Sequence, residues 1–499
     1  MRSRRTVNHT DTTTPARNRG SRWVFGIVAA SALTLTAAAQ SNSNFSYGKD
    51  GFIFSGLADL NWFVKSQKPS EARVDASINL IAQINKVLAK RNIKLVFTLV
   101  PMVERIYENK LPNGFKLGAP LKTFYSRKLP ALKNAGVFAP DLNTAFMTSG
   151  KRYDAQFPMY MRQDNHWSSI GGVEASRVVA QAIRSKYANL LETLPEVKYD
   201  IEWSEPEEFN GNYYRTLPET ERAKLQRELF KPVNFLAQPS SDLLGERTPG
   251  IAVVGTSFSE NRQFGFVEGL AYHLSKETVN NAESGKGPWT PLFDYLNSDS
   301  FQNTPPKILV WEFPEAFMIR SMKPVDGGDD WSRNYFLIQS AANLGGDCGN
   351  AGTRPTISSG VDFTTESGVA SSASTTEKSL VRYGFKNSLR IDQYLSLRVK
   401  SASTSSIYLE TVSSKPNKYF ANLGAYNVSH RVNIPLYTVA DGKATSVNIR
   451  SAIGSDLRVE DVKLCSMPSE LMTLLPGVRD AGIISNGSVI ASDPNPNGR

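Results

Sequence analysis

The sequence predicts an α/β domain with a mostly parallel sheet, followed by an antiparallel β-sandwich. From residue 52 to about residue 335, segments with helical periodicity alternate with short apolar runs rich in β-branched residues. This alternation is typical of a parallel sheet whose strands are buried on both faces. After about residue 345 the chain is rich in Ser and Thr, contains no Trp, and consists of short segments between turn signals. A length of 499 residues also favours more than one domain.

Residues 1–39 have the features of a secretory signal peptide. Arginines lead into an apolar stretch from Trp23 to Ala39, and Ala37 and Ala39 match a small-x-small cleavage site before Gln40. An uncleaved membrane anchor is the alternative, but an Ala-rich stretch of about 17 residues is short for a stable span. We therefore expect an exported protein.

Helices and strands alternate in the α/β domain, which we place at residues 45–340. A first helix, with Ser70 as a candidate N-cap, is followed directly by a strand at residues 93–101. A second helix begins after Ser168, another candidate N-cap, and the segments 250–259 and 307–315 each supply a buried strand that ends in a loop. The first helix is supported by apolar residues at helical spacing, namely Val74, Ile78, Ile81, Ile84 and Leu88.

The β-sandwich is placed at residues 345–470. The segments 390–401, 405–414 and 430–440 have the pattern of strands, and Cys348 and Cys465 lie at the two edges of the region. An even pair of cysteines in an exported protein predicts a disulfide, here joining the first strand region to the last. Two cysteines without a nearby His cannot complete a zinc shell, so we expect no metal site. Residues 476–499 are predicted to form a flexible tail.

The distribution of charge along the chain limits which kinds of polymer the protein is expected to bind. The leader carries six Arg and one Asp, so its removal lowers the net charge from +10 to +5. No concentrated basic stripe remains, which removes the main argument for nucleic acid. Residues 348–465 hold 14 Lys and Arg against 9 Asp and Glu. A β-rich region with this excess suits an anionic polymer.

The segment YMRQDNHWSSIGG, residues 160–172, contains the one histidine outside the leader with a carboxylate two positions away. Asp164 precedes His166, and Trp167 follows it. An imidazole acts as a base when its other nitrogen is held by an acceptor, commonly a carboxylate. The alternative is structural: Asp164 caps the helix that starts near Ser168, and His166 packs beside Trp167.

Ser257 is the candidate nucleophile for this base. The buried strand in IAVVGTSFSEN runs into Gly255 and Thr256, so a turn there places Ser257 at the carboxyl end of the strand, where open α/β sheets keep their sites. An ordinary Gly-Thr-Ser turn is the alternative. The N–H of Ser257 is the first choice of oxyanion donor, and a second donor, Asn261 or another backbone amide, stays open.

The sequence resembles the alginate O-acetyltransferases of the AlgX/AlgJ type, which carry an SGNH-hydrolase-like domain. Three stretches carry the resemblance: the Arg-x-Asp-x-His-Trp signature in residues 160–172, the nucleophile turn VVGTSFS, and the Trp-Glu-Phe-Pro strand end in LVWEFPEAF. The β-rich region with its two cysteines resembles the carbohydrate-binding module of AlgX, which AlgJ lacks. Relative to the usual SGNH order, the arrangement in this chain is circularly permuted.

The resemblance implies periplasmic O-acetylation of an acidic exopolysaccharide, alginate or poly-mannuronate. It implies that Ser257 takes the acetyl group, His166 is the general base and then the acid, and Asp164 orients His166. It implies no cofactor in the chain, a membrane acetyl-relay protein as the donor, and other exopolysaccharide secretion components as partners. Two departures concern the cysteines and the module: a second disulfide inside the α/β domain is impossible, and a sugar platform without Trp would need Tyr408 or Tyr419.

Four basic residues are candidates for contacts with a uronate carboxylate. Arg262 follows the nucleophile turn, Arg320 follows the Trp-Glu-Phe-Pro strand, and Arg398 and Lys400 are alternate residues on one predicted strand. The alternative for Arg398 and Lys400 is a solvated strand face, and for Arg262 and Arg320 it is an ordinary surface charge.

Two other functions use the same residues or the same polymer. A polysaccharide acetylesterase would begin with the same acyl-serine and differ only in the attacking group, water in place of a sugar hydroxyl. A polymer-binding scaffold of a secretion complex would need no catalysis at all.

Overall fold

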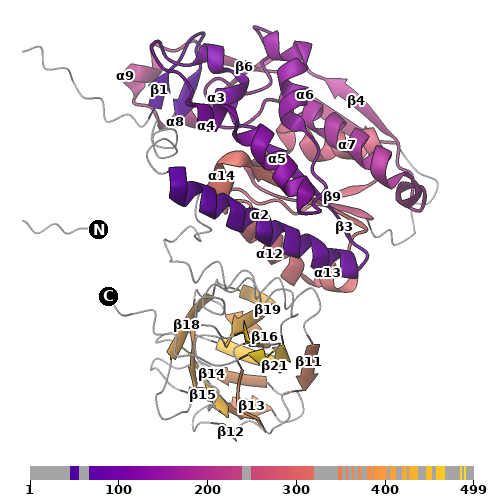
Figure 1. Ribbon diagram of the computed structural model, residues 1–499, viewed down its shortest axis with the longest axis vertical. Helices are drawn as coiled ribbons and strands as arrows, with labels where there is room; N and C mark the ends of the chain where they lie inside the picture. Colours follow the sequence, from indigo (N-terminus) through magenta and orange to yellow (C-terminus); the bar gives the residue numbers. More distant parts are fainter. Residues whose placement is uncertain are drawn as a thin grey trace, which may run out of the picture. The chain divides into compact units, whose positions relative to one another are not determined.

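The computed structural model describes residues 45–55, 67–238 and 249–319, and a series of short ranges between 347 and 489 (Figure 1). The predicted signal peptide, Arg320 and most of the predicted tail lie outside these ranges. Among the helices of the described ranges, none is both long enough and apolar enough to cross a bilayer.

A parallel sheet of four strands forms the centre of the α/β domain. Its order is β3 (Lys94–Val100), β10 (Ile308–Pro314), β8 (Ile251–Val254) and β9 (Thr278–Asn280), and every neighbouring pair is parallel. All residues of β8 and β10 are buried, in agreement with their unbroken apolar character. The predicted parallel sheet is therefore confirmed, and the carboxyl ends of β8 and β10 lie side by side.

The two long helices predicted from periodicity are α2 (Gln67–Lys90) and α7 (Ser169–Glu192). Ser168 is the N-cap of α7, and its hydroxyl oxygen accepts the N–H of Gly171. The expectation that Ser70 caps the first helix is wrong, because α2 starts three residues earlier, at Gln67. Pro69 fits this first turn, where its missing N–H is not needed for an intrahelical bond.

Shorter elements complete the domain. The shorter α-helices are α3 (Val103–Ile106), α4 (Ala119–Lys122), α5 (Phe124–Asn134), α6 (Leu142–Thr148), α8 (Asn212–Thr216), α9 (Glu219–Arg222), α10 (Ser257–Glu260), α11 (Phe266–Leu274), α12 (Trp289–Asn297), α13 (Asp299–Asn303) and α14 (Glu315–Ile319). The 3-10 turns are η1 (Glu108–Lys110), η2 (Gly150–Tyr153) and η3 (Arg262–Phe264). Helices α2 and α6 pack on β3, α12 packs on β8, and α11 packs on α7 and β9.

Three antiparallel ribbons lie outside the central sheet. They pair β1 (Phe45–Tyr47) with β2 (Ile53–Ser55), β4 (Tyr199–Trp203) with β7 (Val233–Ala237), and β5 (Glu207–Phe209) with β6 (Glu228–Phe230). The segment from α7 to β8, residues 193–250, supplies two of these ribbons and the helices α8 and α9. It inserts between the histidine loop and the serine turn in the sequence.

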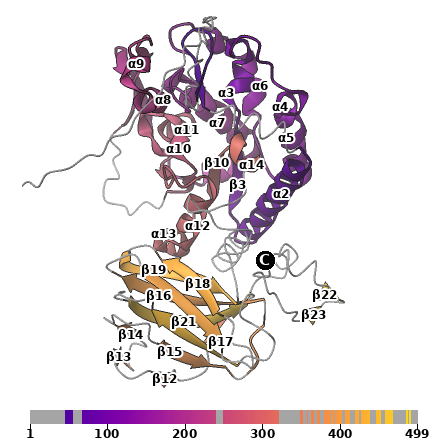
Figure 2. The same cartoon turned by 90° about the vertical axis from the view of Figure 1, so that its left-hand side faces the viewer.

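The C-terminal region consists of antiparallel sheets, as predicted (Figure 2). One sheet contains β11 (Asp347–Asn350), β13 (Asp362–Thr364), β14 (Val369–Ser372), β16 (Gln393–Ser401), β19 (Tyr426–Pro435) and β21 (Leu457–Ser466). A second sheet contains β12 (Thr356–Ile357), β15 (Ser379–Gly384), β17 (Ser405–Thr411), β18 (Lys418–Leu423) and β20 (Ser446–Ser451). The tail includes one short pair, β22 (Ile484–Ser485) and β23 (Ser488–Val489).

The predicted disulfide is present. Cys348 on β11 and Cys465 on β21 are paired in register and joined by an S–S bond. The bridge closes a loop with a sequence separation of 117, so it ties the first strand of this region to the last. The domain limits 45–340 and 345–470 remain predictions.

Candidate active site

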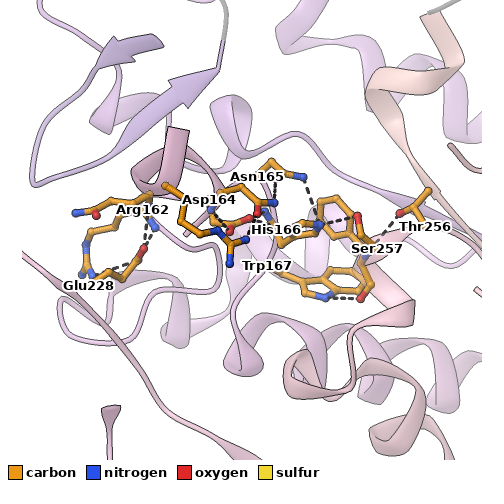
Figure 3. A network of polar contacts seen from close by, with 12 residues as sticks. Arg162, Asp164, Asn165, His166, Trp167, Glu228, Thr256 and Ser257 are labelled. Atoms are coloured by element: carbon orange, nitrogen blue, oxygen red, sulfur yellow. Dashed lines mark hydrogen bonds and ion pairs between the residues drawn. The ribbon is translucent and has the colours of Figure 1, made fainter. Parts of the chain in front are cut away.

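The structure brings Asp164, His166 and Ser257 together in one hydrogen-bonded line (Figure 3). Nε2 of His166 lies 2.7 Å from Oγ of Ser257, and Nδ1 of His166 lies 2.5 Å from Oδ1 of Asp164. An acceptor at Nδ1 fixes the tautomer, so Nε2 is left unprotonated and accepts the Ser257 hydroxyl. His166 and Asp164 are buried, with 4% and 3% exposure. This line has the geometry of an activated serine.

Asp164 orients the histidine and does not cap α7, whose N-cap is Ser168. Its Oδ1 also accepts the backbone N–H of His166, and its Oδ2 accepts the backbone N–H of Asn212 at 2.6 Å. Gly211 allows this approach, because a Cβ there would lie 2.1 Å from the carbonyl oxygen of Gln163. Burial raises the pKa of Asp164, but the hydrogen bonds from His166 and Asn212 outweigh it and hold the pKa below its usual value. The carboxylate is therefore ionised at neutral pH.

Ser257 lies at the carboxyl end of β8 and is the first residue of α10. The oxygen Oγ1 of Thr256 caps this helix and accepts the N–H of Phe258. Among the described residues the N–H of Ser257 has no acceptor, which leaves it available to an oxyanion. Asn261 ends α10 and returns its backbone N–H to the carbonyl oxygen of Ser257 at 3.4 Å. Its side chain makes no hydrogen bond to the triad in the described ranges, so Asn261 is not placed as a second donor.

A buried carboxylate on β10 holds the serine turn in place by hydrogen bonds. Glu312 has no exposed surface, and it accepts three groups of the turn: the N–H of Thr256 at 2.7 Å, the hydroxyl of Thr256 at 3.0 Å, and the hydroxyl of Ser259 at 3.1 Å. Gly255 makes room for it, because a Cβ there would lie 2.5 Å from Glu312 Oε2 and 3.0 Å from its backbone oxygen. Burial raises the pKa of Glu312 to about 7.

A second buried carboxylate holds the histidine loop. Glu228 on β6 is 3% exposed and accepts the backbone N–H groups of Arg162 and Gln163 at 2.5 and 2.9 Å (Figure 3). Burial raises its pKa to about 7, partly offset by the two amides. Each loop of the site is thus fixed by a carboxylate that does not reach the reacting atoms.

Trp167 ties the histidine loop to the serine helix. Its indole N–H donates to the carbonyl oxygen of Phe258 at 3.0 Å, and its side chain is fully buried. The ring of His166 stacks on Phe264 and meets Phe258 edge-on, with ring centres 5.2 and 4.8 Å apart. The tryptophan after the histidine therefore fixes the separation between the two loops.

In the part of the chain that the structure describes, none of the candidate polymer contacts forms a hydrogen bond or ion pair with the triad. Arg262 on η3 is exposed, and its Nε lies 3.5 Å from Glu268. Arg398 and Lys400 lie on β16 of the C-terminal region, and Arg320 falls outside the described residues. A role in polymer binding stays a prediction for all four.

Sequence reasoning missed the groups that position the triad. Glu312 stood inside the quoted Trp-Glu-Phe-Pro stretch, and a lone charge in an apolar strand was a usable signal, because a buried charge needs partners. Glu228, Asn212 and Arg215 carried no such signal. They come from the insertion between the two loops, and their contacts depend on its folding.

Comparison with known proteins places the chain in a family. Residues 46–315 match the family profile described as an SGNH hydrolase-like domain, acetyltransferase AlgX. A probable alginate O-acetylase AlgJ of Pseudomonas syringae pv. tomato is 31% identical over 252 residues, covering 48% of this chain and 62% of that protein. The alginate biosynthesis protein AlgX of Pseudomonas aeruginosa is 26% identical over 255 residues, covering 48% of this chain and 52% of AlgX.

The fold comparison extends beyond the family profile. The solved structure of Pseudomonas aeruginosa AlgX superposes with a TM-score of 0.60 at 16% identity and covers 85% of this chain and 94% of AlgX. The likeness in fold therefore continues into the C-terminal region of antiparallel strands. Because the profile matches more than half of the 499 residues, the chain belongs to the family of SGNH-hydrolase-like acetyltransferase AlgX.

Proposed function

We propose that the protein is an O-acetyltransferase that acetylates hydroxyl groups of an acidic exopolysaccharide of the alginate type through an acetyl-serine intermediate. The observation that carries the proposal is the 2.7 Å contact between His166 Nε2 and Ser257 Oγ, with Asp164 on the other ring nitrogen. The names of the relatives, alginate O-acetylase and alginate biosynthesis protein, support the substrate.

In the first step Ser257 Oγ attacks the carbonyl carbon of the acetyl donor. Its proton moves to His166 Nε2, and the charge that develops on Nδ1–H is stabilised by Asp164. The oxyanion that forms on the carbonyl oxygen meets the N–H of Ser257. When this intermediate collapses, the bond to the donor breaks, the leaving group takes the proton from Nε2, and acetyl-Ser257 remains.

In the second step a sugar hydroxyl attacks the acetyl carbon of Ser257. His166 Nε2 takes the hydroxyl proton as the new C–O bond forms. The bond between the acetyl carbon and Oγ then breaks, and Nε2 returns the proton to Oγ. The serine is regenerated, and the polymer carries the ester.

The cellular setting is part of the same proposal. The signal-peptide features of residues 1–39 support a periplasmic location, where free acetyl-CoA is absent. A membrane acetyl-relay protein would then supply the acetyl group, and other secretion components would deliver the polymer. Fractionation of cells into periplasm, membrane and cytoplasm tests the location, and recovery in the cytoplasm contradicts it.

The activity is tested with a small acetyl donor, p-nitrophenyl acetate, and unacetylated poly-mannuronate. We expect polymer-bound acetate with the wild type, and a rate lower by about 10³-fold or more for Ser257→Ala and for His166→Ala, with an equal or smaller loss for Asp164→Ala. Release of free acetate alone identifies an acetylesterase. Polymer binding without any ester turnover identifies a scaffold, and a near-normal rate for Ser257→Ala removes it as nucleophile.

A further inference from the structure

Asn165 lies between Asp164 and His166 in the sequence, and its side-chain amide reaches Nε2 of His166. Its Nδ2 is 3.3 Å from His166 Nε2, the atom that also accepts the Ser257 hydroxyl at 2.7 Å (Figure 3). An imidazole nitrogen offers one lone pair, and the shorter contact with Ser257 uses it. Among the described residues, this N–H of Asn165 therefore has no acceptor other than its longer, 3.3 Å contact with Nε2.

The orientation of this amide is set from the protein surface. Nδ2 of Asn212 donates to Oδ1 of Asn165 at 2.9 Å, and the guanidinium of Arg215 donates to Oδ1 of Asn212. A guanidinium can only donate, so Asn212 must turn its oxygen to Arg215 and its NH₂ to Asn165. Asn165 must then turn its own NH₂ to His166. A line of three side chains thus runs from an exposed charge to the catalytic nitrogen.

In the second chemical step, the attacking hydroxyl must lie where the N–H of Asn165 points. Once Ser257 carries the acetyl group it has no proton to give, and Nε2 is free for the incoming hydroxyl. The oxygen of that hydroxyl must lie within about 3 Å of Nε2. The N–H of Asn165 can donate to a lone pair of an oxygen in this position while the hydroxyl gives its own proton to Nε2.

The exposed end of this line of side chains is Arg215, whose positive charge suits a carboxylate. Arg215 is exposed, and among the described residues its bond to Asn212 uses one of its five N–H donors. The guanidinium of Arg215 is a fork of N–H donors, and such a fork matches the two oxygens of a carboxylate.

We propose that Asn165, Asn212 and Arg215 form the acceptor subsite for a carboxylate-bearing sugar. Asn165 Nδ2–H holds the attacking hydroxyl at His166 Nε2, Asn212 fixes its orientation, and Arg215 binds a carboxylate of the same chain. This inference rests on the proposed transfer to an acidic polymer. It adds which residues receive that polymer and why a sugar competes with water at the second step.

The test separates the two steps with the full-length chain. The burst of p-nitrophenol from p-nitrophenyl acetate measures acetylation of Ser257, and the ratio of polymer-bound to free acetate measures the fate of the acetyl group. The acceptors are poly-mannuronate and the same polymer with its carboxyl groups reduced to neutral alcohols. The variants are Asn165→Ala, Arg215→Gln and Arg215→Lys. Lys224→Gln, which removes an exposed positive charge from the turn after α9 in the same inserted segment, is the matched control.

We expect Asn165→Ala to lower the ratio of transfer to hydrolysis about tenfold or more while the burst rate changes by less than about threefold. Arg215→Gln should raise the KM for poly-mannuronate about 10-fold to 100-fold and leave the KM for the reduced polymer unchanged, as expected for the loss of a charged hydrogen bond. Arg215→Lys should recover part of this loss, because the charge returns without the fork. Lys224→Gln should match the wild type.

Three results overturn the subsite. One is unchanged transfer in Asn165→Ala and Arg215→Gln, another is an equal loss with the charged and the neutral polymer, and the third is a loss of the burst as large as the loss of transfer. If the wild type itself gives no polymer-bound acetate, the proposed function fails. If the wild type transfers acetate and these variants do as well, only the subsite fails.

Discussion

Replacing Glu312 with Gln should change how the stability of the α/β domain depends on pH. The carboxyl is fully buried beneath the serine turn, and burial raises its pKa from 4.5 to about 7. Below pH 4.5 it is protonated in the folded and the unfolded chain. Between pH 4.5 and about 7 the unfolded chain loses its proton first, so the folded state binds more protons and stability falls as the pH rises.

The size of the effect follows from the two pKa values. A rise from 4.5 to about 7 corresponds to about 3 kcal/mol, at ~1.36 kcal/mol for each pH unit. Gln fits the same contacts as the protonated acid, because its oxygen can accept the N–H of Thr256 while its NH₂ faces a hydroxyl that can rotate. The variant keeps the turn and does not ionise. Its free energy of unfolding should gain about 3 kcal/mol relative to the wild type between pH 4.5 and pH 8.

Urea unfolding followed by Trp fluorescence measures this difference in the relevant domain, because every Trp of the chain precedes residue 332. Glu228 titrates in both chains and cancels in the difference. Glu312→Leu is the control: it leaves the buried N–H of Thr256 without an acceptor and should be less stable than Glu312→Gln by about 1–3 kcal/mol at every pH, because neither variant ionises. A difference between wild type and Glu312→Gln that stays flat from pH 5 to pH 8 would refute the burial of an ionisable group here.

Three further changes test the packing around the site and the disulfide. Gly255→Ala puts a Cβ 2.5 Å from Glu312 Oε2, so urea unfolding should show a loss of about 1–3 kcal/mol. Trp167→Phe removes the indole N–H that donates to the α10 backbone and should cost about 1–3 kcal/mol in the same assay. Cys348→Ala opens the bridge to Cys465, with a separation of 117, and should lower stability by up to about 5 kcal/mol in circular dichroism, an effect that reductant reproduces in the wild type.

The parts of the fold that the sequence predicted are those with a local cause. The strands β8 and β10 are short, apolar and bounded by loops, so their burial on both faces follows from their residues alone. Ser168 could be identified as a cap because the cap and its partner Gly171 are three residues apart. The start of α2 was misplaced because a Ser before an apolar run is weaker evidence than a Pro in the first turn.

The candidate triad could be assembled from sequence for the same reason. Asp164 and His166 are two positions apart, so one turn of the loop joins them, and Ser257 follows a buried strand whose carboxyl end is where such sites lie. What could not be predicted is long-range. Glu312 acts on a turn 56 positions away, and Glu228 acts on a loop 65 positions away. The lone charge of Glu312 in an apolar strand signals that it needs partners, but a single sequence does not identify the partners of either carboxylate.

The order Asp-Asn-His-Trp now has a physical reason at each position. Asp164 and Asn165 contact the two ring nitrogens of His166, Nδ1 and Nε2, whereas His166 and Trp167 reach across to α10. A contact of 2.7 Å between His166 and Ser257 tolerates little movement, since a hydrogen bond weakens steeply as its partners separate. The indole bond lies between the same two loops, so it limits their separation without touching a reacting atom. Trp167 therefore helps to set the geometry of the triad although it takes no part in the chemistry.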